Sequence, residues 1–517
     1  MSRLKFPLVV LAMFCFLGIA EMASAGTTYY VAANGNDSSN GTSKTTPWAH
    51  LPGMATWTGN HTPVAGDTFV LRGCDVWGNP SFPIKWPWAG ATGSPIAIGV
   101  DKTWFNSNCS TGWNRPIFDG GGAMIGSTGE FFHGQTGISN LTLDNIEARG
   151  FFWNTNNSGQ LLSMFCFGNC ASGTHAVTVT NFYVHGWSHT ALGAGGDVCT
   201  VFQGASTSPY SADFDFEYNV VDGTDSTNGG DSCRTFEFIG GTIRFNIVVG
   251  VSNGFRPAGG GELGYNNCSV SQSFDPTIHE NCFETQVPNQ TFYIHDNFIH
   301  DMQAGEGLQV CMSGETDYVW NNVWSLTNGG NPPAIPSNTG SPVSCTAVTL
   351  WNNTIVPQPN VNCVHRTGAS GSTIGTLTIQ NNHCITTGSL NDSFSGVAAT
   401  QIINSDTLMT PTTANTQGYT ASESYQYSPI SSCTPSTCST LGAGTNLSGS
   451  WPSGYSANDT SYACTEQTVA GVVQSLCPAR VVNGRPGSGG GNWDSGAYFY
   501  ATTQLPQPPT DLATIVQ

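Results

Sequence analysis

The sequence contains very little charge. Only 9% of its 517 residues are Asp, Glu, Lys or Arg, and 14 residues are basic. Nucleic acids are bound through clustered Lys and Arg side chains, so this composition argues against a nucleic acid partner. The chain is nevertheless not predicted to be disordered, because 38% of its residues are hydrophobic and they recur along its length.

Long apolar runs are absent after residue 25, so no segment is expected to span a membrane. The first residues have the pattern of a secretory signal. Arg3 and Lys5 precede an apolar run over residues 6–20, and Ala23-Ser24-Ala25 forms a small-x-small cleavage site. We therefore expect residues 1–25 to be a signal peptide and the mature protein to be secreted, to the extracellular space or the periplasm.

The mature chain is predicted to be acidic. Removal of the signal takes away Arg3, Lys5 and Glu21, so 14 basic and 33 acidic residues become 12 and 32, a net charge of −20. This charge repels a polyanionic sugar unless cations or a local basic site intervene.

Cysteine is plentiful. Of 17 cysteines, Cys15 lies in the signal, and an even number of 16 remains in an exported chain, which predicts disulfides. Binding of a metal by thiolates is the alternative, and the absence of two tight CxxC pairs counts against it. The candidate bridges between close cysteines are Cys166/Cys170, Cys268/Cys282, Cys363/Cys384, Cys433/Cys438 and Cys464/Cys477.

Short segments with alternating apolar residues recur, and each ends with asparagine followed by an apolar or β-branched residue. The eight clear copies are LTLDNI (141–146), VTVTNF (177–182), FEYNVV (216–221), IRFNIV (243–248), IHDNFI (294–299), VWNNVW (319–324), TLWNNTI (349–355) and TIQNNHCI (378–385), with a weaker copy LGYNNCSV (263–270). Alternation with period two indicates strands, and repeats of this size indicate a solenoid.

The asparagines of these copies predict one ladder along the solenoid. They are separated by 21–38 residues, and a coil of three short strands and three turns needs roughly 20 residues. Asparagine tolerates left-handed backbone angles at a sharp bend, and its amide can hydrogen bond to the asparagine of the next coil. We expect a structural role for this set: Asn145, Asn181, Asn219, Asn246, Asn267, Asn297, Asn322, Asn353 and Asn382.

The predicted fold is all-β, a right-handed parallel β-helix of about ten coils with terminal caps and disulfides. We expect residues 26–137 to form an N-terminal cap and the first coils, and residues 138–388 the central coils. Residues 389–500 would form the cysteine-containing C-terminal coils or cap, and residues 501–517 a proline-rich tail.

Three features of the chain resemble a known group. The start YYVAANGNDSSNGT (29–42) with Pro47-Trp48, the Asn-Asn repeats and the end WDSGAYFY (493–500) are similar to secreted bacterial right-handed parallel β-helix proteins of the pectate lyase-like superfamily. The end motif more usually reads DIGAYEY, from which Ser495 and Phe499 depart. The superfamily contains polysaccharide lyases, glycoside hydrolases, esterases and non-catalytic surface proteins, so the resemblance implies a fold and leaves the activity open.

Four acids near loop ends are candidate site residues: Asp197, Asp231, Glu280 and Glu306. The first three are each followed two positions later by a cysteine. Equivalent positions of neighbouring coils lie about 4.8 Å apart, so we expect a column of carboxylates. Its repulsion would be offset by a cation such as Ca²⁺ or by a shared proton. The alternative is that these acids are solvated turn residues.

Further candidates lie around this column. Arg256 is expected at the same level, and the resemblance implies an Arg or Lys base that works with Ca²⁺; an ion pair with Asp231 or Glu280 is the alternative. His279 is a candidate acid or base, or a surface histidine. Trp86 and Trp88 could stack on sugar rings or pack in the cap.

These residues give three functional hypotheses. The first is a Ca²⁺-dependent polysaccharide lyase with catalytic Arg256, Asp231, Glu280 and His279. Substrate would bind at Asp197, Glu306, Trp86 and Trp88, and the metal at Asp197, Asp231 and Glu280. The second is a glycoside hydrolase with paired carboxylates. The third is a non-catalytic surface or adhesion protein. In each, the partner is an extracellular polysaccharide and the protein is expected to be a monomer.

Overall fold

The structure is a computed structural model that describes residues 26–110, 112–126, 129–135, 137–153, 162–168, 173–189, 199–210, 212–225, 233–270, 280–337, 340–419, 434–458, 464–477 and 484–499. The predicted signal peptide, the predicted tail, Cys170 and Cys433 lie outside these residues. Among the described residues, no helix is long and apolar enough to cross a membrane.

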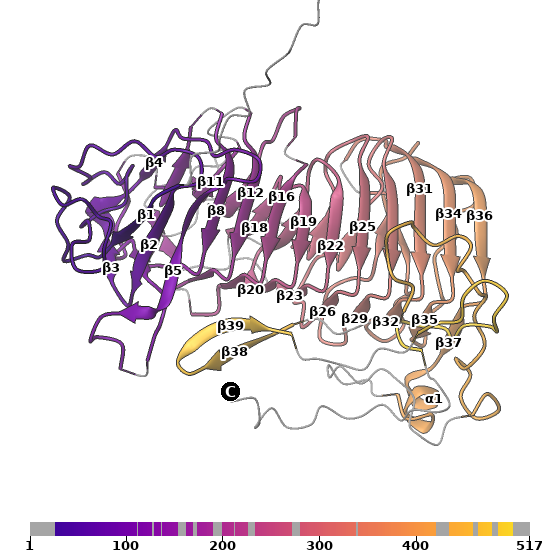
Figure 1. The fold of residues 1–517 in the computed structure, drawn as a ribbon. Coiled ribbons are helices and arrows are strands. Elements are labelled where there is room, and N and C mark those ends of the chain that lie inside the picture. The colour runs from indigo at the N-terminus through magenta and orange to yellow at the C-terminus, as the bar shows by residue number, and fades with distance from the viewer. Residues whose placement is uncertain are drawn as a thin grey trace, which may run out of the picture.

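Three long sheets with only parallel pairing form the molecule (Figure 1). The thirteen-stranded sheet contains, in spatial order, β1 (Thr28–Val31), β2 (Thr68–Gly73), β5 (Ile96–Phe105), β8 (Ser139–Asp144), β12 (His175–Thr180), β16 (Phe214–Glu217), β19 (Gly241–Arg244), β22 (Gly261–Gly264), β25 (Thr291–His295), β28 (Thr316–Trp320), β31 (Ser344–Trp351), β34 (Thr373–Gln380) and β36 (Ala398–Asn404).

The other two sheets follow the same order along the axis. The twelve-stranded sheet contains β3 (Val76–Gly78), β6 (Ile117–Asp119), β9 (Glu147–Arg149), β13 (Tyr183–His185), β17 (Val220–Asp222), β20 (Ile247–Val251), β23 (Asn267–Val270), β26 (Phe298–His300), β29 (Val323–Ser325), β32 (Thr354–Val356), β35 (His383–Ile385) and β37 (Thr407–Met409). The ten-stranded sheet contains β4 (Ile84–Trp86), β7 (Phe132–Gly134), β11 (Leu162–Cys166), β15 (Cys199–Gln203), β18 (Cys233–Glu237), β21 (Asn253–Arg256), β24 (Phe283–Glu284), β27 (Leu308–Gln309), β30 (Ala334–Ile335) and β33 (His365–Arg366).

Few elements lie outside these sheets. They are the parallel pair β10 (Phe152–Trp153) and β14 (Ser188–His189), the antiparallel hairpin β38 (Thr465–Val469) and β39 (Val472–Leu476), the 3-10 turn η1 (Asn79–Ser81) and the helix α1 (Pro411–Thr416). The predicted parallel β-helix is therefore confirmed.

A row of phenylalanines inside the helix sets the register of the ten-stranded sheet. Phe202, Phe236, Phe255 and Phe283 are aligned on successive strands and are at most 1% exposed. Their ring centroids lie 5.3, 5.0 and 4.8 Å apart along the row. Because burying a phenyl ring contributes about 2–3 kcal/mol, this inner row aligns the strands and places the next residue of each strand outside.

The asparagine ladder exists, with a corrected membership. Each member after the first accepts two hydrogen bonds at its Oδ1, from the backbone N–H and the side-chain amide of the preceding member; between Asn322 and Asn353 these are 3.0 and 3.1 Å. The members are Asn219, Asn246, Asn266, Asn297, Asn322, Asn353 and Asn382, and Asp406 ends the row. The prediction of Asn267 was wrong, because the inward position of that coil belongs to Asn266.

The sharp bend is made by the residue before each ladder member, so the two roles predicted for one asparagine are divided. Asn145 and Asn181 occupy this corner with φ of 58° and 57° and are not ladder members. Later coils use Asn321, Asn352 and Asn381 there, with φ of 54°, 52° and 60°. The Asn-Asn pairs of the sequence thus join one corner residue and one ladder residue.

The C-terminal part of the chain returns along this corner. We call residues 434–458, 464–477 and 484–499 the return segment, drawn in yellow in Figure 1. The corner amides donate to its carbonyls: Asn381 to Thr445 at 2.7 Å and Asn352 to Asp494 at 2.9 Å. Near the other end, the Ser475 hydroxyl donates to the carbonyl of Phe245 at 2.6 Å.

Disulfides link the described coils. The predicted bridges Cys268–Cys282, Cys363–Cys384 and Cys464–Cys477 are confirmed. Three further bridges are Cys74–Cys109, Cys199–Cys233 and Cys311–Cys345.

Candidate functional site

Three of the predicted site residues, Asp197, Asp231 and His279, lie outside the described residues. Glu280 and Glu306 lie on neighbouring coils, where the Cys282 N–H donates to the Glu306 carbonyl at 3.2 Å. Glu280 is 1% exposed. Among the described residues, no group of three or more His, Cys, Asp or Glu could hold a metal ion, so Ca²⁺ remains a prediction.

The expected alignment of the acids is wrong for Glu280. Cys199 pairs with Cys233, but Arg234 pairs with Asn253, and Phe255 with Phe283. Counting back from the last pair places Glu280, and not Cys282, level with Cys233. The inner phenylalanine row fixes this register, and Cys282 is instead bonded to Cys268 on the twelve-stranded sheet.

Arg256 is likewise not level with Glu280. It lies level with Glu284, four residues farther along the strand, which is about 13 Å. Its Nη1 donates to both carboxylate oxygens of Glu237 at 2.8 and 2.9 Å, and its Nε donates to Glu284 at 3.0 Å. Arg256 is 5% exposed. Arg256 therefore forms an ion pair whose partners are Glu237 and Glu284, whereas the prediction named Asp231 or Glu280.

The two predicted sugar-stacking rings differ in exposure. Trp86 is 0% exposed and packs edge-on against Trp88 at 4.9 Å, in contact with the rings of Phe69 and Phe132. A ring buried to this extent has no face left for a sugar, so Trp86 has the packing role given as its alternative. Trp88 is partly exposed.

A second polar arrangement lies on the outer face of the thirteen-stranded sheet. Two outward columns run across its strands. One contains Thr178, Asp215, Thr242, Glu262, Tyr293 and Tyr318, and the other contains Thr180, Glu217, Arg244, Gly264, His295 and Trp320. Charged residues therefore occupy β16 to β22, and rings occupy β25 and β28.

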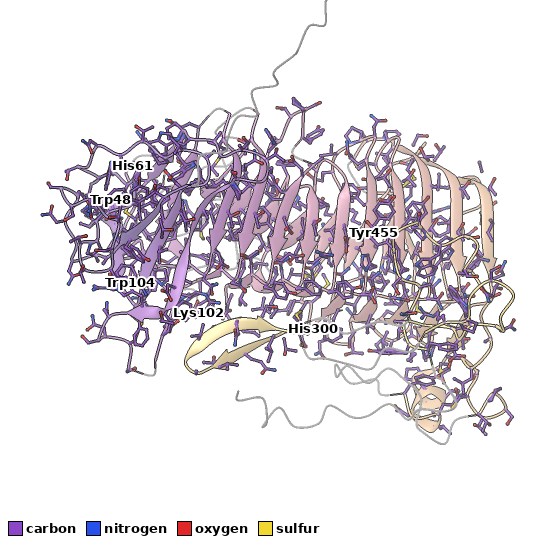
Figure 2. The ribbon with its side chains drawn as sticks, in the orientation of Figure 1. Trp48, His61, Lys102, Trp104, His300 and Tyr455 are labelled. Carbon is purple, nitrogen blue, oxygen red and sulfur yellow. A yellow bond between two sulfur atoms is a disulfide. The ribbon has the colours of Figure 1, made fainter. Side chains whose placement is uncertain are left out.

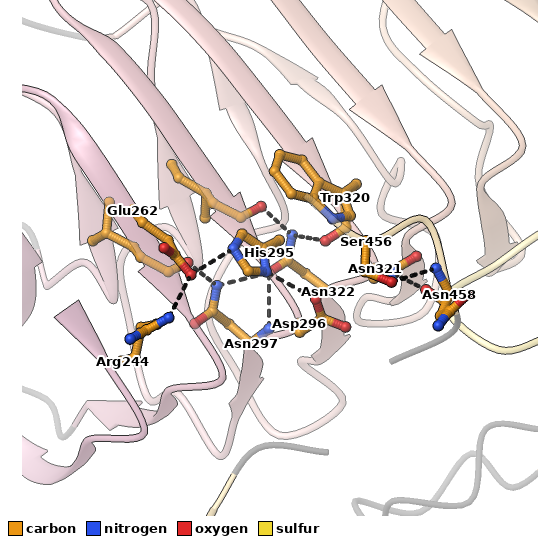
Figure 3. Close-up of polar contacts among 12 residues, drawn as sticks. Arg244, Glu262, His295, Asp296, Asn297, Trp320, Asn321, Asn322, Ser456 and Asn458 are labelled. Atoms are coloured by element: carbon orange, nitrogen blue, oxygen red, sulfur yellow. Dashed lines mark hydrogen bonds and ion pairs between the residues drawn. The ribbon is translucent and has the colours of Figure 1, made fainter. Parts of the chain in front are cut away.

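The charged side chains form a continuous chain of contacts, shown in part in Figure 3. Arg244 donates from Nε to Glu217 at 2.8 Å, and its Nη1 lies 3.7 Å from Glu262 Oε1. The same Glu262 oxygen lies 3.2 Å from His295 Nε2, and His295 Nδ1 lies 2.8 Å from Asp296. Gly264 makes this possible, because a Cβ there would meet the His295 ring at 2.8 Å.

The two carboxyls of the first column have oppositely shifted pKa values. Burial, and then the charges of Glu217 and Glu262, raise the pKa of Asp215 above its ordinary value despite Arg244. Burial also raises the pKa of Glu262, but the hydrogen bond and charge of His295 and the charge of Arg244 outweigh it and lower that pKa. Asp215 is therefore the more readily protonated carboxyl of the two, and Glu262 the one that is more readily ionised.

The contacts of His295 favour its charged form. Burial lowers its pKa, but the hydrogen bonds to Asp296 and Glu262 outweigh burial and raise it. The imidazole ring lies flat on Trp320, with centroids 4.5 Å apart and planes at 7°. It thus holds Glu262 in the ionised form and in a fixed position.

The return segment covers the aromatic half of this face. Tyr455 lies over the sheet (Figure 2), with its ring 4.6 Å from Tyr293 and 5.2 Å from Trp320. Trp451 stacks on Trp351 of β31 at 5.5 Å. Trp320 and Trp351 are accordingly 0% and 6% exposed, whereas the side chains of Glu262 and Arg244 are 17% and 35% exposed.

An acid and a base in one register column are able to act on opposite sides of a bond. Asp215 and Glu262 are two strand spacings apart, about 9.6 Å between their backbones. This is near the carboxyl separation of about 6.5–9.5 Å in glycosidases that invert the anomeric centre. Neither residue lies in a recognisable sequence motif. Asp215 belongs to FDFE and Glu262 to GELG, and these two segments do not resemble each other.

Comparison with known proteins adds to the description of the fold. No family model matches the chain, and no curated protein matches it. Among solved structures, it is similar to the GH136 lacto-N-biosidase from Eubacterium ramulus, with 14% identity and a TM-score of 0.42 over 74% of this chain and 68% of that one. It is also similar to the pectate lyase Pel9A, with 13% identity and a TM-score of 0.42 over 84% and 94% of the two chains.

A further similar structure is a mannuronic acid-specific family 6 polysaccharide lyase from human gut microbiota. It has 11% identity and a TM-score of 0.39, over 68% of this chain and 83% of that one. Identities and scores this low concern the fold, and they carry no argument about the chemistry of this chain.

Proposed function

We propose that the protein hydrolyses an uncharged extracellular polysaccharide on the outer face of the thirteen-stranded sheet, with Asp215 as general acid and Glu262 as general base. The observation that supports this most is their shared register column, two strands apart, beside the exposed edge of an aromatic surface. Paired carboxyls and aromatic rings are the groups that glycan hydrolysis requires.

The reaction uses both carboxyls in one displacement. Glu262 takes a proton from a water molecule as the water oxygen bonds to the anomeric carbon. The bond from that carbon to the glycosidic oxygen breaks, and Asp215 gives its proton to the leaving oxygen. The products are two shorter glycans, and the separation of the carboxyls predicts inversion at the anomeric carbon.

The charge around the pair favours an uncharged substrate. The positive groups Arg244 and His295 are each held by carboxylates, Arg244 at 2.5 Å from Glu217 and His295 between Glu262 and Asp296. Among the described residues that contact the pair, no surplus positive charge remains to receive a uronate. The net charge of the whole chain, −19, also disfavours an anionic substrate.

Asp215→Asn and Glu262→Gln test the proposal. Each should lower kcat by roughly 10²–10⁴-fold on the polysaccharide that the wild type cleaves, because each removes one proton transfer. Purified protein would be screened on xylan, β-glucan, mannan, galactan, arabinan and polygalacturonate, with reducing ends and unsaturated products measured in parallel. Asp213→Asn is the matched control, since Asp213 is exposed, pairs with His175 at 3.5 Å and belongs to neither outward column.

The outcomes separate the three hypotheses. Reducing ends without unsaturated product, lost in both variants, support hydrolysis, and NMR of the first product should show the inverted anomer. Activity that survives both substitutions would refute the assignment. No cleavage of any substrate, together with glycan binding, would favour the non-catalytic surface protein.

The second candidate function is the predicted β-elimination at the ten-stranded sheet. Its support is the buried Arg256 between Glu237 and Glu284, since a buried ion pair costs desolvation energy and hydrophobic residues would stabilise the fold equally well. Glu280 and Glu306 lie at the same sheet, and Asp197, Asp231 and His279 stay in this proposal with Ca²⁺. The hydrogen bonds to the two carboxylates hold the guanidinium, so Arg256 would have to leave them before acting as a base, which makes hydrolysis the favoured proposal.

Lyase activity is tested by the absorbance of unsaturated products. It should appear on polygalacturonate or alginate, disappear with a chelator, and be lost in Arg256→Lys. If absorbance develops unchanged in the presence of chelator, Ca²⁺ has no part in the reaction.

A further inference from the structure

We infer that the return segment makes the protein an exo-acting enzyme. It would remove the terminal unit at the non-reducing end of an uncharged polysaccharide. The inference rests on the proposed hydrolysis by Asp215 and Glu262, and it adds which end of the chain is bound and the size of the product.

The face is open on one side of the acid pair. Toward the N-terminus, β12 and β8 present Thr180, Thr178 and Thr142, all partly exposed. Threonine hydroxyls on a flat sheet both donate and accept hydrogen bonds, as sugar hydroxyls do. A glycan lying across the strands can therefore continue past Asp215 in this direction.

The face is closed on the other side. From β25 to β31 the outward column consists of His295, Trp320 and Trp351, which are at most 6% exposed because Tyr455 and Trp451 lie on them. Tyr455 and Tyr293 are one strand spacing, about 4.8 Å, beyond Glu262. A glycan running toward the C-terminus meets these rings almost at once.

Tyr455 is suited to contact an uncharged sugar end. Burial, the charge of Glu262 and the neighbouring Tyr293 raise the pKa of Tyr455 to about 12, so its hydroxyl stays protonated as a donor. Its ring is partly exposed and tilted by 30° against Tyr293. The two rings form an end surface that combines apolar contact with hydroxyl groups.

The assignment of acid and base fixes which end is bound. The leaving oxygen lies on the side of the acid, so the rest of the polymer extends past Asp215 over β12 and β8. The sugar that supplies the anomeric carbon lies toward Glu262 and the tyrosines. Because the polymer leaves with its reducing end, the short product comes from the non-reducing end.

The experiment uses the polysaccharide that is cleaved in the screen, in two forms. With a fluorescent label on the reducing ends, the early short product should be unlabelled and of one size, while the labelled polymer shortens slowly. With the same polysaccharide dyed and crosslinked, the wild type should release no dye, because only cleavage within the chain releases it.

Opening the closed side should change this pattern. The double variant Tyr455→Ala, Trp451→Ala should release dye and give labelled products of many sizes, while Ser456→Ala should behave as the wild type. Correct folding of the double variant would be checked by an unchanged circular dichroism spectrum and a cooperative unfolding transition, whose midpoint should be lower because two packed rings are removed. If the double variant fails to fold, the product pattern of the wild type still decides between cleavage at the chain end and cleavage within the chain.

The results distinguish the two proposals. A wild type that gives many sizes from the start, or a labelled short product, overturns the exo inference even when Asp215→Asn and Glu262→Gln are inactive. Activity that survives those substitutions overturns the proposed function, and the exo inference with it.

Discussion

Two rows of side chains run along the same helix with the same strand spacing, and they differ in one respect. The ladder repeats one residue type over seven coils, from Asn219 to Asn382. The outer column of the thirteen-stranded sheet changes at each coil, from Thr178 through Asp215, Thr242 and Glu262 to Tyr293. A repeated residue solves a problem that every coil shares, whereas a residue that changes has a use at one place.

The outer row of the ten-stranded sheet is also of the changing kind. Residues Gln203, Glu237, Arg256, Glu284 and Gln309 follow one another on five strands, immediately after the inner phenyl and leucine side chains. They are 0–9% exposed. The predictions below test whether repeated rows act on stability and changing rows on chemistry.

The largest effect is expected where a changing row is buried. Arg256→Ala should lower the free energy of unfolding by about 3 kcal/mol, because it removes the buried cation that Glu237 and Glu284 share, while Glu237 keeps Arg234 at 2.8 Å. Urea unfolding followed by fluorescence measures it. Arg244→Ala is the matched control: its side chain is 35% exposed, so its loss should cost less than about 1 kcal/mol. Equal losses in both variants would contradict the role given to burial.

The second-largest effect is expected when the repeated asparagine row is broken. Asn322→Ala should lower the free energy of unfolding by about 2–3 kcal/mol, because Asn297 loses its acceptor and the Ile294 carbonyl its donor in a fully buried place. Activity per folded molecule should not change. Asn321→Ala, at the adjacent corner, removes the bond to the Asn458 carbonyl and the bond that Asn321 accepts from Arg485, so it should cost about 2 kcal/mol while leaving the ladder intact. A fall in activity at unchanged stability would show that the ladder has a catalytic part.

The repeated row is also the feature of the structure that could be predicted from the sequence. The alternating segments and their asparagines predict a parallel β-helix because each coil must meet the same requirement at the same place. It was harder to predict which asparagine of a pair belongs to the ladder, because LGYNNCSV contains two adjacent asparagines and only Asn266 points inward. No pattern in one coil says which of two amides is buried.

The changing rows were not predictable from the sequence, for the same physical reason. Asp215 and Glu262 are neighbours only through the strand register, which the inner side chains fix. Cysteine spacing misled the alignment of Glu280, because Cys282 bonds across to another sheet while Cys199 and Cys233 bond along one. Arg256 was recognised as unusual, but its partners Glu237 and Glu284 do not stand out in the sequence.

A smaller effect concerns the end of the ladder. Burial raises the pKa of Asp406 to about 7, although the hydrogen bonds from Asn382 lower it. A folded-state pKa above the unfolded one means that stability is complete below pH 3.8 and is lost as pH rises through 7. Asp406→Asn should therefore be more stable than the wild type by about 1–2 kcal/mol at pH 8 and equal at pH 3.5. Thermal unfolding at both pH values measures the difference, and a gain that is the same at both would point to packing instead.

The smallest effect is expected in a changing row on the twelve-stranded sheet, where Asp119, Arg149, His185 and Asp222 are aligned. Burial lowers the pKa of His185, but its contacts with Asp225 at 2.6 Å and Glu147 at 3.3 Å outweigh burial and raise the pKa to about 9.

Because this pKa is raised, the stability that His185 contributes is complete below pH 6.5 and is lost as pH rises through 9. Asp225 is 45% exposed, so solvent weakens the pair and the contribution should be roughly 1 kcal/mol. His185→Gln keeps a hydrogen-bonding side chain without the charge and should remove the pH dependence between pH 7 and 10, with no change in activity. The pKa of the His185 ring, followed by NMR, should fall toward its ordinary value in Asp225→Asn. A ring that titrates near 6.5 in the wild type would mean that this row carries no interaction, and that its changing residues are there for neither stability nor chemistry.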